Sequence, residues 1–204
     1  MIESHDSLRE LFDVGFVIIR DAINREQLRK LGETYDLMVA SARPPDLSIG
    51  RTTTRVSNIA NYSSDFHQLC VYRPILDACS YVIRQPFKLS TLHARTVRPH
   101  SSAQPLHADF EADADGWPML GFIFMFDDFR TDNGATRFVP GSHCWSSAPQ
   151  DAEADPVSKD HTELVACGVA GSLILYNGSV WHGHSANRTD ELRRSIQGAY
   201  IRDC

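Results

Sequence analysis

The sequence predicts an α+β chain that is mainly β, with helices first and many short strands afterwards. Residues 1–85 carry apolar side chains at helical spacing. Residues 86–204 contain short apolar runs separated by Gly, Asn, Asp and Pro, which is typical of strands joined by turns. A length of 204 residues suits one domain with a sizeable core. We therefore expect a single domain over 1–204, in which the helical part supports a β core.

The helices are expected in the first part of the chain, at about 4–12, 24–43 and 73–84, with one strand at 16–19. Asn24 begins the second helix, and Gln27 follows three residues later as in a capping box. Pro44 ends that helix, because proline has no amide hydrogen to donate. The polar stretch 46–64 has no clear period, so it is expected to be loop or weak strand.

Most strands are expected after residue 86, at 87–97, 119–126, 135–139, 164–165, 172–176, 179–183 and 195–201. The run 119–126 is apolar at nearly every position, so both of its faces are expected to be covered. Asn177-Gly178 is typical of a hairpin turn. The segment 142–163 is polar and is expected to form a surface loop near the entrance of the site.

Composition excludes several classes of function. A net charge of -6 argues against nucleic acid, because phosphate binding needs clustered Lys and Arg. The first residues are polar and acidic, unlike a signal peptide, and no apolar run is long enough to cross a bilayer. The five cysteines form no CxxC, so we expect thiols in a reducing cytoplasmic location.

A candidate metal site begins with His107 and Asp109. On a strand these two residues would lie on the same face. An HxD pair is a weak signal alone, and a third ligand must come from elsewhere. Two histidines and one carboxylate form the facial triad of non-haem Fe(II) oxygenases. The candidates for the third ligand are His143, His161, His182 and His184.

The surrounding sequence separates these candidates in part. His161 lies in the polar loop and is expected to be solvated. His143 follows a Pro-Gly turn, where a structural role capping that turn is expected. His182 and His184 would share one face of a strand, so spacing does not choose between them.

Arg193 and Ser195 suggest an anion site near the metal. They would also share a strand face, and Arg193 follows His182 by 193 - 182 = 11 residues. A guanidinium can bind a carboxylate through two hydrogen bonds, and a hydroxyl adds a third donor. A metal beside such a group suits a dicarboxylate that also chelates the metal.

Four segments in chain order resemble the phytanoyl-CoA dioxygenase family of Fe(II)- and 2-oxoglutarate-dependent oxygenases. They are GFVIIRDA (15–22), QPLHAD (104–109), DNGATRFVPGSH (132–143), and WHGHSANR (181–188) followed by RRS (193–195). The resemblance implies a double-stranded β-helix, or jelly roll, with the N-terminal helices packed outside.

The same resemblance implies roles for particular residues. His107, Asp109 and His182 match the iron ligands, and the step from His182 to Asn187 favours His182 over His184. Arg193 matches the residue that pairs with the far carboxylate of 2-oxoglutarate, and Ser195 assists it. Gln104 and Thr136 match positions that contact the co-substrate in some members.

The implied activity is oxidation of a small molecule by O2, most simply hydroxylation, with release of succinate and CO2. Halogenation is not expected, because Asp109 stands where related halogenases have a small residue. The alternative is a cupin-like metal-binding protein without oxygenase activity. Candidates for substrate contact are Arg55, Asn58, His93, Trp181 and the stretch 110–117. The acidic residues within 110–117 are expected to be solvated, and would favour a cationic or polyhydroxylated substrate if they faced the site.

Overall fold

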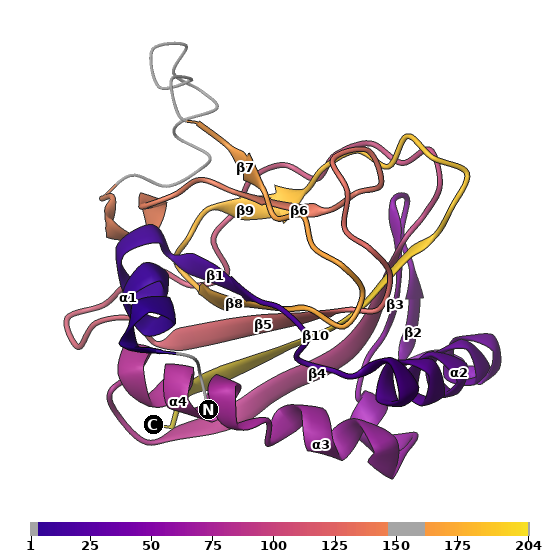
Figure 1. Cartoon of the computed structure of the whole chain (residues 1–204), viewed down its shortest axis with the longest axis horizontal. Helices are drawn as coiled ribbons and strands as arrows, with labels where there is room; N and C mark the ends of the chain where they lie inside the picture. The colour runs from indigo at the N-terminus through magenta and orange to yellow at the C-terminus, as the bar shows by residue number, and fades with distance from the viewer. Residues whose placement is uncertain (1–3, 147–161, 204) are drawn as a thin grey trace.

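The computed structural model describes residues 4–146 and 162–203, which form two facing antiparallel sheets (Figure 1). The large sheet has seven strands in the order β1-β8-β5-β10-β4-β3-β2, and the small sheet has three in the order β7-β6-β9. The strands of the large sheet are β1 (Phe16–Ile19), β2 (Leu47–Ile49), β3 (Thr53–Val56), β4 (Phe87–Val97), β5 (Met119–Met125), β8 (Leu173–Asn177) and β10 (Arg193–Arg202). Those of the small sheet are β6 (Thr136–Phe138), β7 (Leu164–Val165) and β9 (His182–His184). The expected mainly-β architecture is confirmed.

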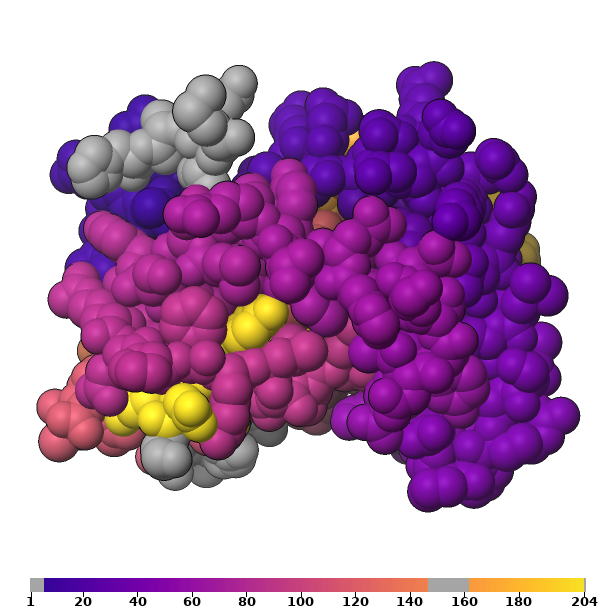
Figure 2. Space-filling view, turned by 90° about the horizontal axis from the view of Figure 1, so that it is seen from below, coloured from indigo at the N-terminus to yellow at the C-terminus, as the bar shows by residue number. Residues whose placement is uncertain are grey.

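The helices pack around the large sheet: the first lies at one end, beside β1, and the others lie on the side that faces away from the small sheet (Figure 1). They are α1 (Ser4–Val14), α2 (Arg25–Ser41), α3 (His67–Cys70) and α4 (Arg73–Val82), with short 3-10 turns η1 (Ile59–Asn61), η2 (Ser64–Phe66) and η3 (Ser142–Cys144). Seen from below, residues from the first half of the chain cover most of the surface (Figure 2). The first part of the chain therefore forms the outer layer, as expected.

Local sequence explains where these helices begin and end. Asn24 Oδ1 accepts a hydrogen bond from the Gln27 amide at 2.9 Å, and Asn24 Nδ2 donates to Gln27 Oε1 at 2.8 Å. This pair satisfies a free amide at the start of α2. The helix buries Leu31, Tyr35 and Met38. The stretch 46–64, expected to be loop or weak strand, contains the short strands β2 and β3 and a 3-10 turn.

The two faces of the large sheet have different compositions, because side chains alternate along a strand. In β10, Arg193, Ser195 and Gln197 face the small sheet. Ile196 and Tyr200 of the same strand belong to the core beneath the helices. Strand β5 is buried along its whole length, as its apolar sequence predicts, because it lies between β8 and β10 and is covered on both faces.

The expected hairpin at Asn177-Gly178 is wrong. Strands β8 and β9 lie in different sheets, so this turn carries the chain from one sheet to the other. Asn177 Oδ1 accepts a hydrogen bond from the Ser179 amide at 2.9 Å, which fixes a local turn without strand pairing. The strand expected at 179–183 is correspondingly short and begins at His182.

Two further sequence expectations concern the chain surface. Most of the segment 142–163, including His161, lies outside the described residues. No helix in the described ranges is both long enough and apolar enough to span a bilayer.

Candidate active site

His107 is fixed by backbone hydrogen bonds to the small sheet. Its amide donates to the His182 carbonyl at 3.0 Å, and the His182 amide donates to the His107 carbonyl at 2.9 Å. The segment around His107 forms only this isolated bridge, so the expectation that His107 and Asp109 lie on one regular strand is wrong. Asp109 is held separately, since its amide donates to the Gly178 carbonyl at 2.9 Å. The backbone thus brings two separate parts of the chain together at one point.

The two imidazole rings are oriented by main-chain carbonyls. Nδ1 of His182 lies 2.9 Å from the Val180 carbonyl, and Nδ1 of His107 lies 3.3 Å from the Pro105 carbonyl. Because a carbonyl only accepts, each Nδ1 carries the proton and each Nε2 keeps a free lone pair. One ligand atom from each of His107, Asp109 and His182 lies within 4.8 Å of the others. This donor set fits a facial-triad iron site.

The burial of His182 also suits a metal ligand. Burial lowers the pKa of His182 to about 4, although the Asp109 carboxylate opposes this effect. The ring is therefore neutral near neutral pH, which is the form that binds a metal.

Tyr176 orients the carboxylate of Asp109. Its hydroxyl donates to Asp109 Oδ2 at 2.9 Å, and burial, followed by the nearby carboxylate, raises the pKa of Tyr176 well above its usual value. Gly121 lies directly opposite Tyr176, and a Cβ at Gly121 would come within 2.1 Å of the Tyr176 ring. The absence of a side chain at Gly121 therefore makes room for the tyrosine beside the triad.

Replacing Tyr176 with phenylalanine is expected to weaken metal binding by roughly 10- to 100-fold, because a hydrogen bond that orients a metal ligand is lost. Calorimetry with Fe(II) or Co(II) under argon measures this change. Tyr200→Phe is the matched control, since the Tyr200 hydroxyl donates to the Cys70 carbonyl on the other face of the sheet. Equal metal affinities for wild type and Tyr176→Phe would contradict the proposed orienting role.

The other histidines have different surroundings. His143 is buried and its Nε2 lies 2.9 Å from the Phe12 carbonyl, so its role is structural as expected, although its partner lies on α1 and not in its own turn. His184 is buried and its Nδ1 lies 2.8 Å from the Ser185 carbonyl. Neither belongs to the cluster of ligand atoms found among the described residues.

Arg193 is a buried cation, with 1% of its surface exposed. It donates to Ser195 Oγ at 3.1 Å and to the Gly134 carbonyl at 2.8 Å. Burial, and then the neighbouring Arg95, lower the pKa of Arg193 to about 9, so it remains charged near neutral pH. Its guanidinium carbon lies 4.3 Å from the centre of the Phe129 ring.

The polar contacts of Arg193 leave its charge uncompensated. No carboxylate in the described ranges forms an ion pair with it, and its buried Nε has no hydrogen-bond partner there. A buried charge is costly unless it is paired. The site therefore fits the far carboxylate of 2-oxoglutarate.

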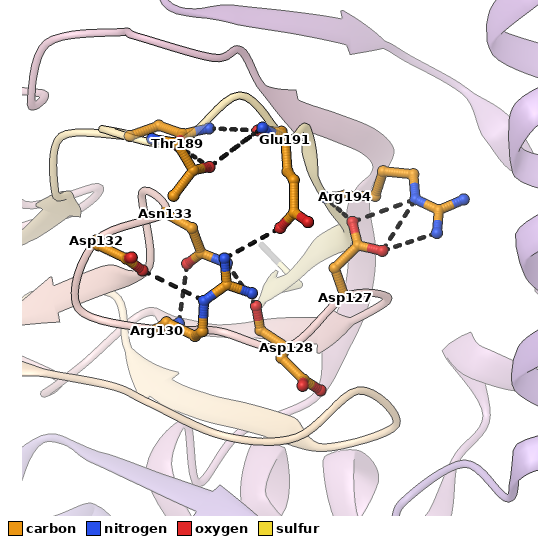
Figure 3. Close-up of polar contacts among 9 residues, drawn as sticks. Asp127, Asp128, Arg130, Asp132, Asn133, Thr189, Glu191 and Arg194 are labelled. Carbon is orange, nitrogen blue, oxygen red and sulfur yellow. Dashed lines mark hydrogen bonds and ion pairs between the residues drawn. The ribbon is translucent and has the colours of Figure 1, made fainter.

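The loop that presents the Gly134 carbonyl is held by a polar network (Figure 3). Asn133 Oδ1 accepts from the Arg130 amide at 2.8 Å, and Arg130 Nη2 donates to Glu191 Oε2 at 3.0 Å. The network joins this loop to the segment before β10. It thereby fixes the acceptor that orients the Arg193 guanidinium.

Of the remaining residues expected at the site, Gln104 and Ser195 lie close to it. Gln104 Oε1 accepts a hydrogen bond from Arg95 Nη2 at 2.8 Å, and Gln104 lines the cavity that contains the triad. Ser195 is buried and its hydroxyl donates to the Arg95 carbonyl at 3.1 Å. Thr136 is buried directly opposite His184, on the small sheet.

A cavity of about 330 Å³ opens from the triad along β4 and β10. Of the expected substrate contacts, Arg55, His93 and Phe110 line it, whereas Trp181 is buried against Trp145 outside the lining. Asn58 is also outside, and its side chain donates to Asp46. Among the lining residues that the sequence did not indicate are Arg95, Tyr176 and Gln197. Alternation along β4 and β10 could have indicated Arg95 and Gln197, whereas Tyr176 lies in an apolar strand that gives no such signal.

Comparisons with known proteins agree with this geometry. The dioxygenase cdmA of Talaromyces verruculosus is 26% identical over 222 residues, covering 96% of this chain and 73% of its own length. The dioxygenase andF of Emericella variicolor is 24% identical over 213 residues, covering 96% of this chain and 73% of its own length.

Solved structures show the same fold. The non-heme alpha-ketoglutarate-dependent epimerase SnoN from nogalamycin biosynthesis superposes with a TM-score of 0.82 at 19% identity, covering 97% of this chain and 80% of its own. HygX from Streptomyces hygroscopicus, solved with nickel and 2-oxoglutarate, superposes with a TM-score of 0.79 at 18% identity, covering 98% of this chain and 87% of its own.

A family model described as phytanoyl-CoA dioxygenase (PhyH) matches residues 12–195, which is most of the sequence. The chain therefore belongs to the phytanoyl-CoA dioxygenase family and is a dioxygenase of the iron- and 2-oxoglutarate-dependent class.

Proposed function

We propose that this chain hydroxylates a small-molecule substrate with Fe(II), 2-oxoglutarate and O2, and releases succinate and CO2. One observation carries the proposal: besides the triad of His107, Asp109 and His182, the described residues include a buried cation without an ion-pair partner, Arg193. Arg193 is linked to the cavity through the sheet. It donates a hydrogen bond to Ser195, and Ser195 lies opposite Arg95, which lines the cavity. We propose further that residues 1–204 act as one domain, in a reducing compartment such as the cytoplasm.

In this proposal the protein residues bind and orient the reactants. His107, Asp109 and His182 hold the iron, and Tyr176 keeps the Asp109 carboxylate in one orientation. Arg193 and Ser195 bind the far carboxylate of 2-oxoglutarate, with Gln104 and Thr136 as additional contacts. When bound, iron and 2-oxoglutarate supply the oxidation of a C–H bond by O2.

The surrounding core limits the access of water. The ring of Phe138 lies 5.7 Å from that of His182, and the ring of Tyr176 lies 4.8 Å from it. These side chains cover the inner side of the triad, so the open side is the cavity along β4 and β10. His107 is half-buried and Asp109 is exposed on this open side, so we expect a substrate to approach the triad from that cavity.

The test is succinate formation by the iron-loaded protein in the presence of 2-oxoglutarate and pooled candidate small molecules. Mass spectrometry identifies the substrate consumed, and a product heavier by one oxygen atom supports hydroxylation. A product lighter than the substrate by two hydrogen atoms would instead show that the reaction is a desaturation. A wild-type protein that binds a metal but never 2-oxoglutarate would instead support the cupin-like alternative.

A further inference from the structure

Two arginines face each other across neighbouring strands inside the cavity. Arg55 on β3 lies directly opposite Arg95 on β4, and both line the cavity. Like charges directly opposite in a sheet destabilise it. Within the described ranges, neither arginine forms an ion pair with a carboxylate, and Arg95 donates instead to the neutral Gln104. The pair therefore has the properties of an unfilled anion site.

Bound iron and 2-oxoglutarate would not neutralise the charges of these two arginines. The positive charges of Fe(II) and Arg193 are already balanced by the negative charges of Asp109 and of the two carboxylates of 2-oxoglutarate. Asp109 is the only carboxylate among the described residues that line the cavity. Arg55 and Arg95 therefore leave a net positive cavity even when metal and co-substrate are bound.

The acidic loop after the metal segment does not supply the missing charge. Glu111, Asp113 and Asp115 are exposed, and none of them lines the cavity. Asp113 instead accepts a hydrogen bond from Arg202 at 2.8 Å. These acidic residues therefore do not face the site, and the loop gives no reason to expect a cationic substrate.

Next to the arginines lies a neutral polar group that is also available. His93 is on the same face of β4 as Arg95, and it lies opposite Gln197 on β10. Its Nδ1 is buried and has no hydrogen-bond partner among the described residues. Burial, followed by the charges of Arg55 and Arg95, lowers the pKa of His93 to about 4, so the ring is neutral near neutral pH.

The two arginines lie at different depths. Arg95 is opposite Ser195, which binds Arg193, whereas Arg55 is one strand further from β10 and more exposed. Adjacent strands are about 4.8 Å apart, so Arg55 is about two strand spacings from Arg193 and Ser195, which we call the co-substrate clamp. Arg55 is therefore placed to bind a group on the substrate.

We propose that the substrate is an organic anion whose acidic group binds to the Arg55–Arg95 pair, with His93 as an additional contact. This inference rests on the proposed function, because it assumes that Arg193 holds the 2-oxoglutarate. The rest of the lining combines the apolar side chains of Met119, Ala199 and Ile201 with the polar side chains of Ser90, Thr91 and Gln197, so the body of the substrate is expected to carry both apolar and polar groups.

The test uses matched phenyl compounds and the protein loaded with Ni(II) and saturating 2-oxoglutarate. The probes are 3-phenylpropanoate, phenyl phosphate, 3-phenylpropanamide and phenethylammonium, and ligand-observed NMR measures their dissociation constants. We expect at least one anion to bind about tenfold more tightly than the amide, and raised salt to reduce this difference. The preferred anion distinguishes a carboxylate from a phosphate. Equal binding of all probes, or preference for the ammonium, would overturn the inference.

Variants show whether the effect comes from the proposed site. Arg55→Gln is expected to remove the preference for the anion while leaving 2-oxoglutarate affinity unchanged, and Arg55→Lys is expected to restore part of it. Arg98→Gln is the matched control, because Arg98 is exposed, bonds the Gly50 carbonyl and does not line the cavity. Weaker 2-oxoglutarate binding by Arg55→Gln would assign Arg55 to the co-substrate and overturn the inference. Failure of wild type to bind 2-oxoglutarate would instead overturn the proposed function.

Discussion

Alanine at His107, Asp109 or His182 is expected to reduce metal affinity by more than about 100-fold, because each change removes a ligand and not merely a group that orients one. Each variant is also expected to lose succinate formation. Calorimetry with Fe(II) or Co(II) under argon measures the first effect, and an uncoupled turnover assay with 2-oxoglutarate measures the second.

His184→Ala provides the comparison, because His184 lies two residues after His182 on the same strand. It is expected to keep the metal, whereas His182→Ala is expected to lose it. Circular dichroism of each variant separates loss of a ligand from loss of the fold. If the two variants exchanged these results, His184 would be the third ligand and the geometry of the triad would be wrong.

Arg193→Gln is expected to weaken 2-oxoglutarate binding by roughly two orders of magnitude or more. Losing one member of a buried charge pair costs about 2–5 kcal/mol. Arg193→Lys is expected to recover only part of this affinity, since an ammonium lacks the planar pair of donors of a guanidinium. Titration of the metal-loaded protein with 2-oxoglutarate measures both changes.

The neighbouring residue is the control for this prediction. Arg194 points to the other side of the sheet, where it pairs with Asp127 at 2.7 Å and with Asp36 at 2.9 Å (Figure 3 shows the pair with Asp127). Arg194→Gln is expected to lower stability and leave the affinity for 2-oxoglutarate unchanged. Similar losses of 2-oxoglutarate affinity in the two variants would mean that the loss reflects damage to β10 and not a specific contact.

Those parts of the fold that depend on local chemistry could be predicted from the sequence. The cap at Asn24 forms because its side chain reaches an amide three residues away, and β5 is buried because almost every residue in it is apolar. The composition of the triad could also be predicted from the family resemblance. In these cases neighbouring residues, or a recognisable motif, carry the information.

What could not be predicted depends on contacts between distant parts of the chain. The segment of His107 and Asp109 is positioned by backbone hydrogen bonds with His182 and to the Gly178 carbonyl, far along the sequence, and not by strand geometry of its own. The sequence Asn177-Gly178 predicts a turn, but it does not determine whether the strand after the turn joins the same sheet or the other one. Tyr176 becomes important only because the fold places Asp109 beside it.

Side chains of β10 alternate between the two faces of the large sheet, and this alternation limits how the protein can change in evolution. Inserting one residue early in the strand would shift its register, so that positions facing the small sheet would face the helices. Arg193, Ser195 and Gln197 would then no longer face the site. Hydrophobic residues from the core between the sheet and the helices would point into the cavity in their place. A substitution, in contrast, alters one contact at a time, and the exposed residues 111–116 lie outside this paired register. Changes in length there would leave the register of β10 intact, whereas new selectivity within the sheet must arise by replacing side chains at fixed positions.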